Sequence, residues 1–362
     1  MKTWIAGALA ALSLTAPAAA FAASPYDAAV AQGDFTIKDF RFRSGESLPE
    51  LKMHYRTLGK PARDAQGRVT NAVMVLHGTG GTGAQFLNPI FANELYGPGQ
   101  PLDITRYYVI LPDNVGHGGS SKPSDGLRAK FPHYDYDDMV EAQRRLLVDG
   151  LKVDRLRLLM GTSMGCMHGF VWGETHPDFV QAIMPMACLP VQIAGMNRYW
   201  RTAAIETIKA DPAWNGGDYR AQPIIGLRGA TNLVLLMGAA PQAWQAQAPT
   251  REQAEAMYQA RIAADLPSRD ANDLIYQLDS SRNYDPSKDL EKITAPVTWV
   301  NSTDDLINPP DFGIAEPAAK RLKAGKFVLI QATKETRGHG THTAARFWKQ
   351  DLVELLGRSE GR

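Results

Sequence analysis

The sequence predicts an α/β protein with a mostly parallel eight-stranded sheet, helices on both faces of the sheet and a helical cap insertion. Three observations carry this prediction. Short apolar, β-branched runs alternate with helical stretches along most of the chain, which is typical of a parallel sheet covered by helices. The first two runs instead alternate apolar and polar residues, as an antiparallel edge does. Residues 189–285 interrupt the rhythm without a convincing strand.

The expected strands are short and bounded by turn residues, as buried parallel strands are. They lie at residues 35–43, 51–58, 72–76, 107–111, 156–160, 182–186, 297–300 and 327–330. Helices are expected at residues 137–151, 163–176 and 343–356, with another at 250–264 inside the insertion. The chain therefore divides into a signal segment (1–23), a first part of the core (24–188), the cap (189–285) and a second part of the core (286–362).

Composition limits the classes of partner. The 362 residues are 44% hydrophobic and 21% charged, which is ordinary for a globular enzyme and too apolar for a disordered chain. A formal net charge of +1 gives no long-range attraction to nucleic acid or to anionic membranes. We therefore expect a small-molecule substrate and no nucleic-acid partner.

The first residues have the pattern of an export signal. Lys2 precedes an apolar stretch at residues 4–14, and Pro17 with a run of small residues follows it. We predict cleavage after Ala22 or Ala23, which would leave a periplasmic or secreted protein without a membrane span. An uncleaved N-terminal anchor is the alternative.

Cys166 and Cys188 are the two cysteines of the sequence. An exported protein can join them, but two cysteines do not make a disulfide framework and a chain of this size does not need one. We expect paired buried thiols, with a disulfide left open. Cys166 is not expected to be a nucleophile, because a serine already occupies the reactive position described next.

The strongest local signal is the segment from Gly161 to Gly165, with Ser163 at its centre. A buried strand runs into G-x-S-x-G and then into a helix, which is the context of a nucleophile elbow. The serine there sits on a sharp, strained turn, so small residues are needed on either side of it. The helix start also favours developing negative charge.

A glycine-rich segment follows the strand at residues 72–76 and begins with His77 and Gly78. Glycines of this kind bring bare backbone amides close to a substrate. We assign the oxyanion hole to the backbone amides of Thr79 and Met164. A phosphate-binding loop is the competing interpretation, but the G-x-x-x-x-G-K pattern is absent from the sequence.

A serine nucleophile needs a base and an orienting acid, expected later in the chain in the order Ser, Asp, His. Asp304 and Asp305 follow the strand at residues 297–300, and His339 and His342 follow the last strand. We choose Asp304 and His339. Asp305 and His342 remain the alternatives, and a metal site on the two histidines is disfavoured because no further ligands accompany them.

With these residues the chain resembles the α/β-hydrolase superfamily, and within it is similar to the homoserine O-acetyltransferase group over residues 71–356. The further motifs that carry this resemblance are Gly97-Pro98-Gly99 before Asp103, Arg106-Tyr107, Asp138-Met139-Val140 with Ala142-Gln143-Arg144, Met167 after the elbow, Ala210-Asp211-Pro212, and Trp214-Asn215-Gly216-Gly217-Asp218-Tyr219. The resemblance implies Ser163, Asp304 and His339 in the roles given above. Members of the group are often dimers, which leaves a homodimer open.

In that group the serine is acylated by acetyl-CoA and passes the acyl group to a hydroxyl acceptor. Ile205 stands where the resemblance leads us to expect an arginine for the acceptor's carboxylate, although Arg198 and Arg201 lie nearby. An exported enzyme would also rarely meet a coenzyme A thioester. We therefore expect a serine hydrolase of esters or related acyl compounds, with no cofactor and no metal. O-acyl transfer and a non-catalytic binding protein are the alternatives.

Overall fold

The computed structural model describes residues 26–361 of the chain. The predicted export signal at residues 1–23 lies outside them. Eight strands form one sheet in the order β1-β2-β4-β3-β5-β6-β7-β8. The first two strands and the β2–β4 pair are antiparallel, and all other neighbours are parallel. The predicted mostly parallel eight-stranded sheet with an antiparallel edge is confirmed.

Each strand lies within two or three residues of its predicted position, or extends beyond it. The strands are β1 (Ala31–Arg41), β2 (Ser47–Leu58), β3 (Ala72–Leu76), β4 (Tyr108–Pro112), β5 (Leu158–Thr162), β6 (Ile183–Met186), β7 (Val297–Ser302) and β8 (Gly325–Ile330). The central strands are buried on both faces, which explains their continuous apolar sequence.

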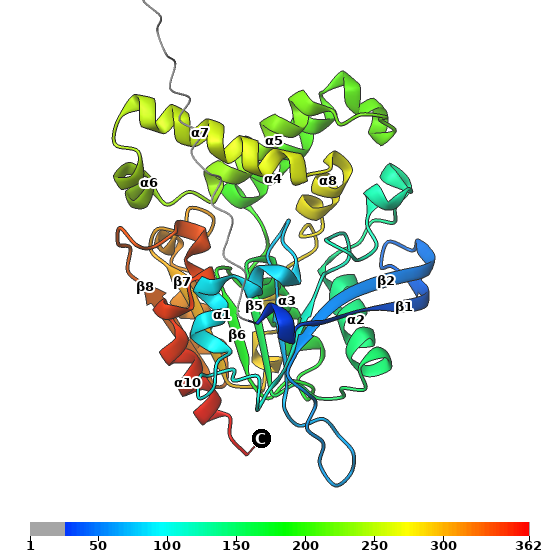
Figure 1. The fold of residues 1–362 in the computed structure, drawn as a ribbon, viewed down its shortest axis with the longest axis vertical. Helices are drawn as coiled ribbons and strands as arrows, with labels where there is room; N and C mark the ends of the chain where they lie inside the picture. Colours follow the sequence, from blue (N-terminus) through cyan, green and yellow to red (C-terminus); the bar gives the residue numbers. More distant parts are fainter. Residues whose placement is uncertain (1–25, 362) are drawn as a thin grey trace, which may run out of the picture.

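Helices cover both faces of this sheet (Figure 1). The α-helices are α1 (Pro89–Leu95), α2 (Tyr136–Arg145), α3 (Met164–Thr175), α4 (Gly195–Lys209), α5 (Ile224–Met237), α6 (Pro241–Gln247), α7 (Arg251–Asp265), α8 (Ala271–Asp279), α9 (Ala315–Arg321) and α10 (Lys349–Arg358). Helices α1 and α10 pack with Val73 and Met160 on one face. Helices α2, α3 and α9 pack with Met74 and Leu159 on the other, so alternate strand residues serve two separate cores.

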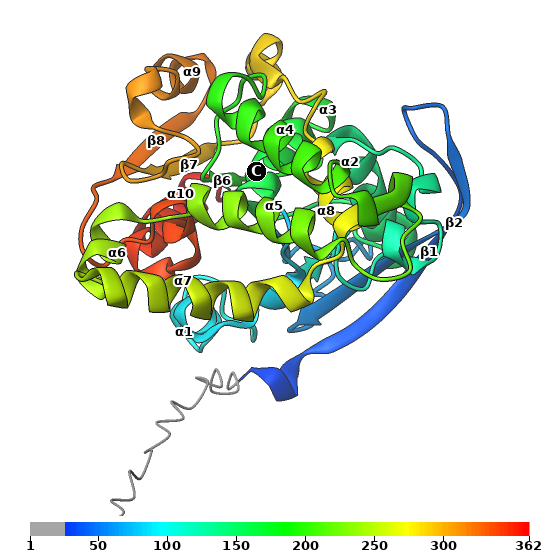
Figure 2. The same cartoon turned by 90° about the horizontal axis from the view of Figure 1, so that it is seen from above.

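The predicted insertion corresponds to helices α4–α8, which leave the sheet after β6 and return before β7. They lie above the sheet in Figure 1, and the view from above shows α5 and α7 extending across the molecule (Figure 2). Helix α7 begins with a capping box in which Thr250 and Gln253 bond reciprocally. Because parallel strands end at one edge, the cap covers the edge at which β5, β6 and β7 end.

No single helix within residues 26–361 is long and apolar enough to cross a bilayer. Helices α5 and α6 meet the length and composition criteria only together, as a pair bent by 104°.

Two local predictions differ from the structure. The last helix begins at Lys349 instead of residue 343, because residues 338–347 form 3-10 turns that carry His339 back under the sheet edge. The expected pair of buried thiols is also wrong. Cys166 and Cys188 are joined by a disulfide, with their Cα atoms 5.9 Å apart.

The elbow after β5 depends on two glycines. A methyl group on Gly161 would lie 1.9 Å from the carbonyl oxygen of Gly165, and one on Gly165 would lie 2.2 Å from that of Leu76. Both contacts are with backbone, which cannot turn away as a side chain can. Helix α3 can therefore approach β3 and β5 only without side chains at these positions.

We expect Gly165→Ala to lower the free energy of unfolding by about 3 kcal/mol, since β3 and α3 must move apart. The matched control is Gly357→Ala in α10, where an added methyl group meets nothing within 4 Å. That substitution should instead stabilise the protein by roughly 0.5 kcal/mol. Urea unfolding curves measure both changes, and equal effects of the two substitutions would contradict the close approach.

Candidate active site

Ser163 lies at the turn between β5 and α3 in a strained backbone conformation. Its φ of 53° and ψ of −110° are unusual for a residue with a side chain. Its backbone amide donates a hydrogen bond to Met186 O at 2.8 Å, which anchors the turn to the end of β6. The turn leaves the serine partly exposed while the residues on both sides of it are buried. This is the elbow geometry that the sequence predicts.

Two backbone amides lie next to this serine without an acceptor. Met164 begins α3, and Thr79 follows Gly78, whose Cα packs against the Ser163 side chain. Within residues 26–361, neither the Thr79 nor the Met164 amide donates a hydrogen bond to another group. The two amides are therefore free to donate to a ligand atom, as the oxyanion assignment requires.

A buried histidine fixes the peptide that carries one of these amides. The Nδ1–H of His77 donates to Gly78 O at 2.8 Å, and its Nε2 accepts from the Asn114 backbone amide at 3.0 Å. The Gly78 carbonyl and the Thr79 amide belong to one planar peptide, so holding the first orients the second. Burial lowers the pKa of His77, which keeps the ring neutral and its tautomer fixed.

Further hydrogen bonds hold the glycine-rich loop that follows β3. Asp113 follows β4, and its carboxylate accepts from the Gly83 amide at 2.8 Å and from the Gly119 amide at 2.9 Å. The Arg56 guanidinium pairs with Asp113 at 2.8 Å and balances the buried charge. The two glycine-rich segments after β3 and β4 are thus joined through one carboxylate.

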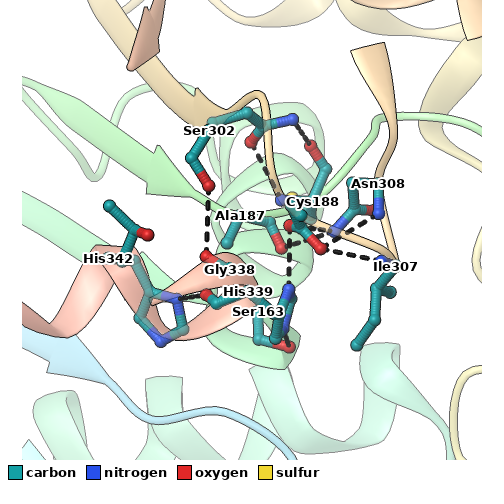
Figure 3. Close-up of polar contacts among 12 residues, drawn as sticks. Ser163, Ala187, Cys188, Ser302, Ile307, Asn308, Gly338, His339 and His342 are labelled. Atoms are coloured by element: carbon teal, nitrogen blue, oxygen red, sulfur yellow. Dashed lines mark hydrogen bonds and ion pairs between the residues drawn. The ribbon is translucent and has the colours of Figure 1, made fainter. Parts of the chain in front are cut away.

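His339 lies beside Ser163 (Figure 3), and its other ring nitrogen contacts an acid. The Ser163 hydroxyl donates to His339 Nε2 at 2.8 Å, and His339 Nδ1–H donates to Asp305 Oδ2 at 2.9 Å. These three side chains come from the ends of β5 and β7 and from the loop after β8. The arrangement can remove a proton from the serine as it attacks a carbonyl carbon.

The acid in this arrangement is Asp305 and not the predicted Asp304. Asp305 is fully buried, and its carboxylate also accepts from the Ile307 amide at 2.8 Å and from Asn308 Nδ2 at 3.0 Å. Burial alone would raise the pKa of Asp305, but attraction to His339 and these hydrogen bonds lower it. The carboxylate is therefore ionised where it faces the imidazole.

Asp304 has a different place, because consecutive side chains in this turn point in different directions. Its Oδ2 accepts from Thr336 Oγ1 at 2.7 Å and from the Gly338 amide at 3.0 Å. Both donors lie in the loop that carries His339. Asp304 thus holds the loop of the histidine, while Asp305 contacts the histidine itself.

His342 does not face the serine. Its Nδ1–H donates to the backbone oxygen of His339, and burial lowers the pKa of His342 to about 3. The ring is thus neutral and shapes the turn beside His339. Among residues 26–361, no cluster of three or more His, Cys, Asp or Glu side chains is arranged to hold a metal ion.

The sequence interpretation missed Asn308, Thr336 and Gln143. Asn308 bonds both Asp305 and Ala187 O, and Gln143 donates to Asn114 Oδ1 at 2.5 Å beneath the oxyanion loop. The Asn308-Pro309 pair is an ordinary turn signal in the sequence. Gln143 lies on a predicted helix whose apolar stripe indicates only packing against the sheet. Gln143 belongs to the Ala142-Gln143-Arg144 motif of the resemblance, but neither that motif nor the turn signal at Asn308 indicates which residue is contacted.

The comparisons with known proteins agree with this geometry. Residues 71–336 match the family model described as alpha/beta hydrolase fold. The chain belongs to the α/β-hydrolase fold family. A probable acyltransferase of Methanothermobacter thermautotrophicus is 28% identical over 299 residues, which cover 82% of this chain and 90% of that protein.

A homoserine O-acetyltransferase of Haloferax prahovense is 36% identical over 225 residues. The match covers 56% of this chain and 52% of that protein, so the chain spans about half the length of this relative. The protein is therefore similar to the homoserine O-acetyltransferase group, as the motifs predict.

Two solved structures share the fold over nearly their whole length. The homoserine O-acetyltransferase from Bacillus anthracis has a TM-score of 0.79 at 21% identity and covers 91% of this chain and 98% of its own. Esterase E22 has a TM-score of 0.77 at 19% identity and covers 90% and 100%. Taken with the family match and the acyltransferase relatives, the protein is an enzyme of the α/β-hydrolase type.

We expect Asp305→Asn to lower kcat by roughly 10⁴-fold, because the amide no longer stabilises the imidazolium or fixes its tautomer. Asp304→Asn is the matched control, since an asparagine oxygen can still accept one bond from the His339 loop, and it should lower kcat by less than about tenfold. Hydrolysis of p-nitrophenyl acetate measures both. A larger loss in Asp304→Asn would return the acid role to Asp304.

Proposed function

We propose that the protein hydrolyses a carboxylic ester or a related acyl compound through an acyl-enzyme on Ser163. The observation that carries this proposal is the unbroken hydrogen-bonded series from Ser163 Oγ through His339 to Asp305, beside two unpaired amides. The relatives named as acyltransferases and the esterase of the same fold support an acyl group as the transferred unit.

His339 takes the proton of Ser163 as the hydroxyl oxygen attacks the acyl carbonyl. Asp305 stabilises the imidazolium that forms, and the Thr79 and Met164 amides donate to the negative oxygen of the tetrahedral intermediate. A donor of this kind lowers the barrier by about 3 to 4 kcal/mol. The imidazolium then protonates the leaving alcohol, and a water molecule activated by His339 releases the acid.

An apolar groove near the site supports an apolar group in the substrate, although Ser163 and His339 do not line it. This groove of about 350 Å³ runs beside the loop of Asp305, between the start of the cap and the turn at Ile314. Its lining is mainly apolar and includes Leu189, Ile193, Met196, Ile307 and Phe312. An acyl or alkyl chain would bury its surface there at about 25 cal/mol per Å².

We also propose that the enzyme acts in the periplasm or outside the cell. The pattern of a charged start, a short apolar stretch and small residues before Ala23 supports export. The Cys166–Cys188 disulfide supports it as well, since disulfides persist in oxidising compartments. Because an exported enzyme would rarely meet a coenzyme A thioester, the acyl donor is a different compound.

Acyl transfer to a hydroxyl acceptor is the second candidate, and one buried cation favours it. Arg201 on α4 is 2% exposed, and its Nε donates to Asn197 Oδ1 at 2.9 Å. Its Nη1 has no hydrogen-bond partner within the described part of the chain, and its charged neighbour is Arg198 instead of a carboxylate. The guanidinium lies 4.8 Å from the centre of the Trp200 ring, but a buried cation without a carboxylate partner is costly unless a ligand supplies the anion.

The Arg201 side chain lies near the glycine-rich loop that carries Thr79. The Tyr136 hydroxyl is close enough to both Arg201 and Thr79 to interact with them, although none of its contacts has the geometry of a hydrogen bond. Burial lowers the pKa of Arg201 without neutralising it. An acceptor with a carboxylate could place that group on Arg201 and its hydroxyl near Ser163.

The first experiment uses the protein without residues 1–23, a series of p-nitrophenyl esters, and homoserine as an optional acceptor. We expect free acid as the product, labelling of Ser163 by a fluorophosphonate, and loss of both in Ser163→Ala with the fold retained by circular dichroism. Labelling that persists in Ser163→Ala would overturn the assignment of the nucleophile. An O-acyl product, identified by mass spectrometry, would favour the transferase.

If Arg201 binds an acceptor carboxylate, Arg201→Gln should lower the preference for homoserine over its methyl ester by about 10- to 100-fold, which is the range of a hydrogen bond to a charged group. Hydrolysis of p-nitrophenyl acetate should change little. Arg228→Gln on the exposed side of α5 is the control. An unchanged preference would remove the observation that favours transfer.

A further inference from the structure

Three residues at the end of β6 connect the nucleophile to the acid. Met186 O accepts from the Ser163 amide at 2.8 Å, and Ala187 O accepts from Asn308 Nδ2 at 3.1 Å. The same Asn308 amide group donates to Asp305 Oδ2 at 3.0 Å. We refer to residues 186–188 as the hub segment. Its path sets both the turn of the serine and the orientation of the carboxylate.

The middle of the hub segment is strained. Ala187 has a φ of 63°, in the left-handed region that glycine adopts without a steric penalty and alanine does not. Such a conformation costs of order 1 kcal/mol or more and persists only where the surroundings fix it. Something must therefore prevent Ala187 from relaxing to a negative φ.

The Ala187 amide donates to Val300 O at 2.8 Å, and the next residue, Cys188, is held by several further contacts. Its carbonyl accepts from Trp299 Nε1 at 3.0 Å and from Asn301 Nδ2 at 3.1 Å, and its amide donates to Asn301 Oδ1 at 3.2 Å. These bonds tie it to β7. The disulfide to Cys166 ties it covalently to the first turn of α3, three residues beyond Ser163. Figure 3 shows Ala187 and Cys188 beside Asn308, close to Ser163 and His339.

The disulfide is thus the covalent link between the helix that follows the nucleophile and the strained segment that orients the acid. Both cysteines are fully buried, at 0% and 1% exposed. The bond closes a separation of 22 residues that includes β6. A bond whose role was only to restrict the unfolded chain would not need this position.

We propose that the Cys166–Cys188 disulfide positions Asp305 through Ala187 and Asn308, so that its formation activates the enzyme. This proposal rests on the hydrolase function proposed above. In the dithiol form, Ala187 relaxes, Asn308 loses its acceptor on the hub segment, and Asp305 is no longer held against His339 Nδ1. The serine, the histidine and the substrate groove keep their places.

The activating step is a two-electron oxidation by a disulfide-bearing oxidant. One cysteine thiolate attacks a sulfur of that oxidant and releases a thiolate, and the second cysteine then displaces the remaining thiol of the mixed disulfide. The two protein thiols lose two electrons and two protons, and the oxidant disulfide becomes two thiols. Because the cysteines end fully buried, this exchange must come before the final packing of α3 on β6.

The test compares the oxidised enzyme with Cys166→Ala/Cys188→Ala, and with the same double variant carrying Ala187→Gly. We expect the double variant to lose about 10²-fold in kcat with little change in KM, since a misplaced catalytic group costs this much while substrate contacts remain. Ala187→Gly should recover most of the loss, because glycine keeps a φ near 63° without the disulfide. Ile37→Ala in β1, a buried position separated from β6 by four other strands of the sheet, is the control for lost stability alone.

A second measurement does not depend on turnover. The proton shared by His339 Nδ1 and Asp305 should give a downfield NMR signal that is absent in His339→Gln. We expect this signal in the oxidised enzyme, its loss in the double variant, and its return with Ala187→Gly. If the oxidised enzyme shows the signal but hydrolyses no ester, the proposed function fails while the positioning role is still decided by the signal.

Wild-type kcat and an intact signal in the double variant would overturn the proposal, as would an Ala187→Gly addition that raises only the melting temperature. If the double variant does not fold, the wild-type protein reduced with a phosphine under mild urea replaces it, with thiols counted by mass spectrometry. Unfolding in that sample too would show that the disulfide is needed for the fold and not for the site, which also overturns the proposal.

Discussion

The site depends on the close approach of α3 to β3 and β5. Bare glycines at both ends of the elbow allow a carbonyl of the neighbouring strand to touch the first turn of the helix. That contact forces Ser163 into a backbone conformation that it would not adopt alone. Because the strain is held by two cores on opposite faces of the sheet, the serine is fixed before any substrate arrives.

A second constraint is the burial of charge around this turn. Asp305 has no access to water, so its ionised form persists only because His339, Asn308 and the Ile307 amide all stabilise it. The buried Asp113 carboxylate pairs with Arg56 and accepts hydrogen bonds from two loop amides. Asp305 and Asp113 are thus two buried carboxylates near Ser163 whose oxygens are satisfied by donors of the protein.

The parts of the fold that were predicted correctly are those with a local signal. About twenty consecutive residues contain the pattern of a buried strand, a G-x-S-x-G turn and a helix. The sequence therefore predicts β5, the position of Ser163 and α3. The choice between Asp304 and Asp305 could not follow, because both acids end the same strand and only the turn decides which one faces the histidine. The disulfide was missed for a similar reason. Cys166 and Cys188 meet only because β6 lies beside β5 in the folded sheet.

The start of the last helix shows the opposite case, in which a local pattern was overridden. Residues 343–347 have suitable helical spacing, yet they form turns, because the chain must first bring His339 to Ser163 and then turn into α10. Residues 189–285 show no strand pattern. The sequence therefore places the cap between the strands on either side of this segment, which are β6 and β7. One of its helices was predicted at residues 250–264, and in the structure Thr250 caps the start of α7.

Asp304 and Asp305 also determine where this fold can change in length. One acid holds the loop that carries the histidine, and its neighbour holds the histidine ring. An extra residue in this turn would rotate one of them away and separate two loops that are far apart in the sequence. The connection after Cys188, one strand earlier, instead accommodates the whole helical cap. Insertions are therefore tolerated in the connection after β6 and excluded in the turn after β7. Among proteins of this fold, differences in substrate choice are expected to arise in the cap.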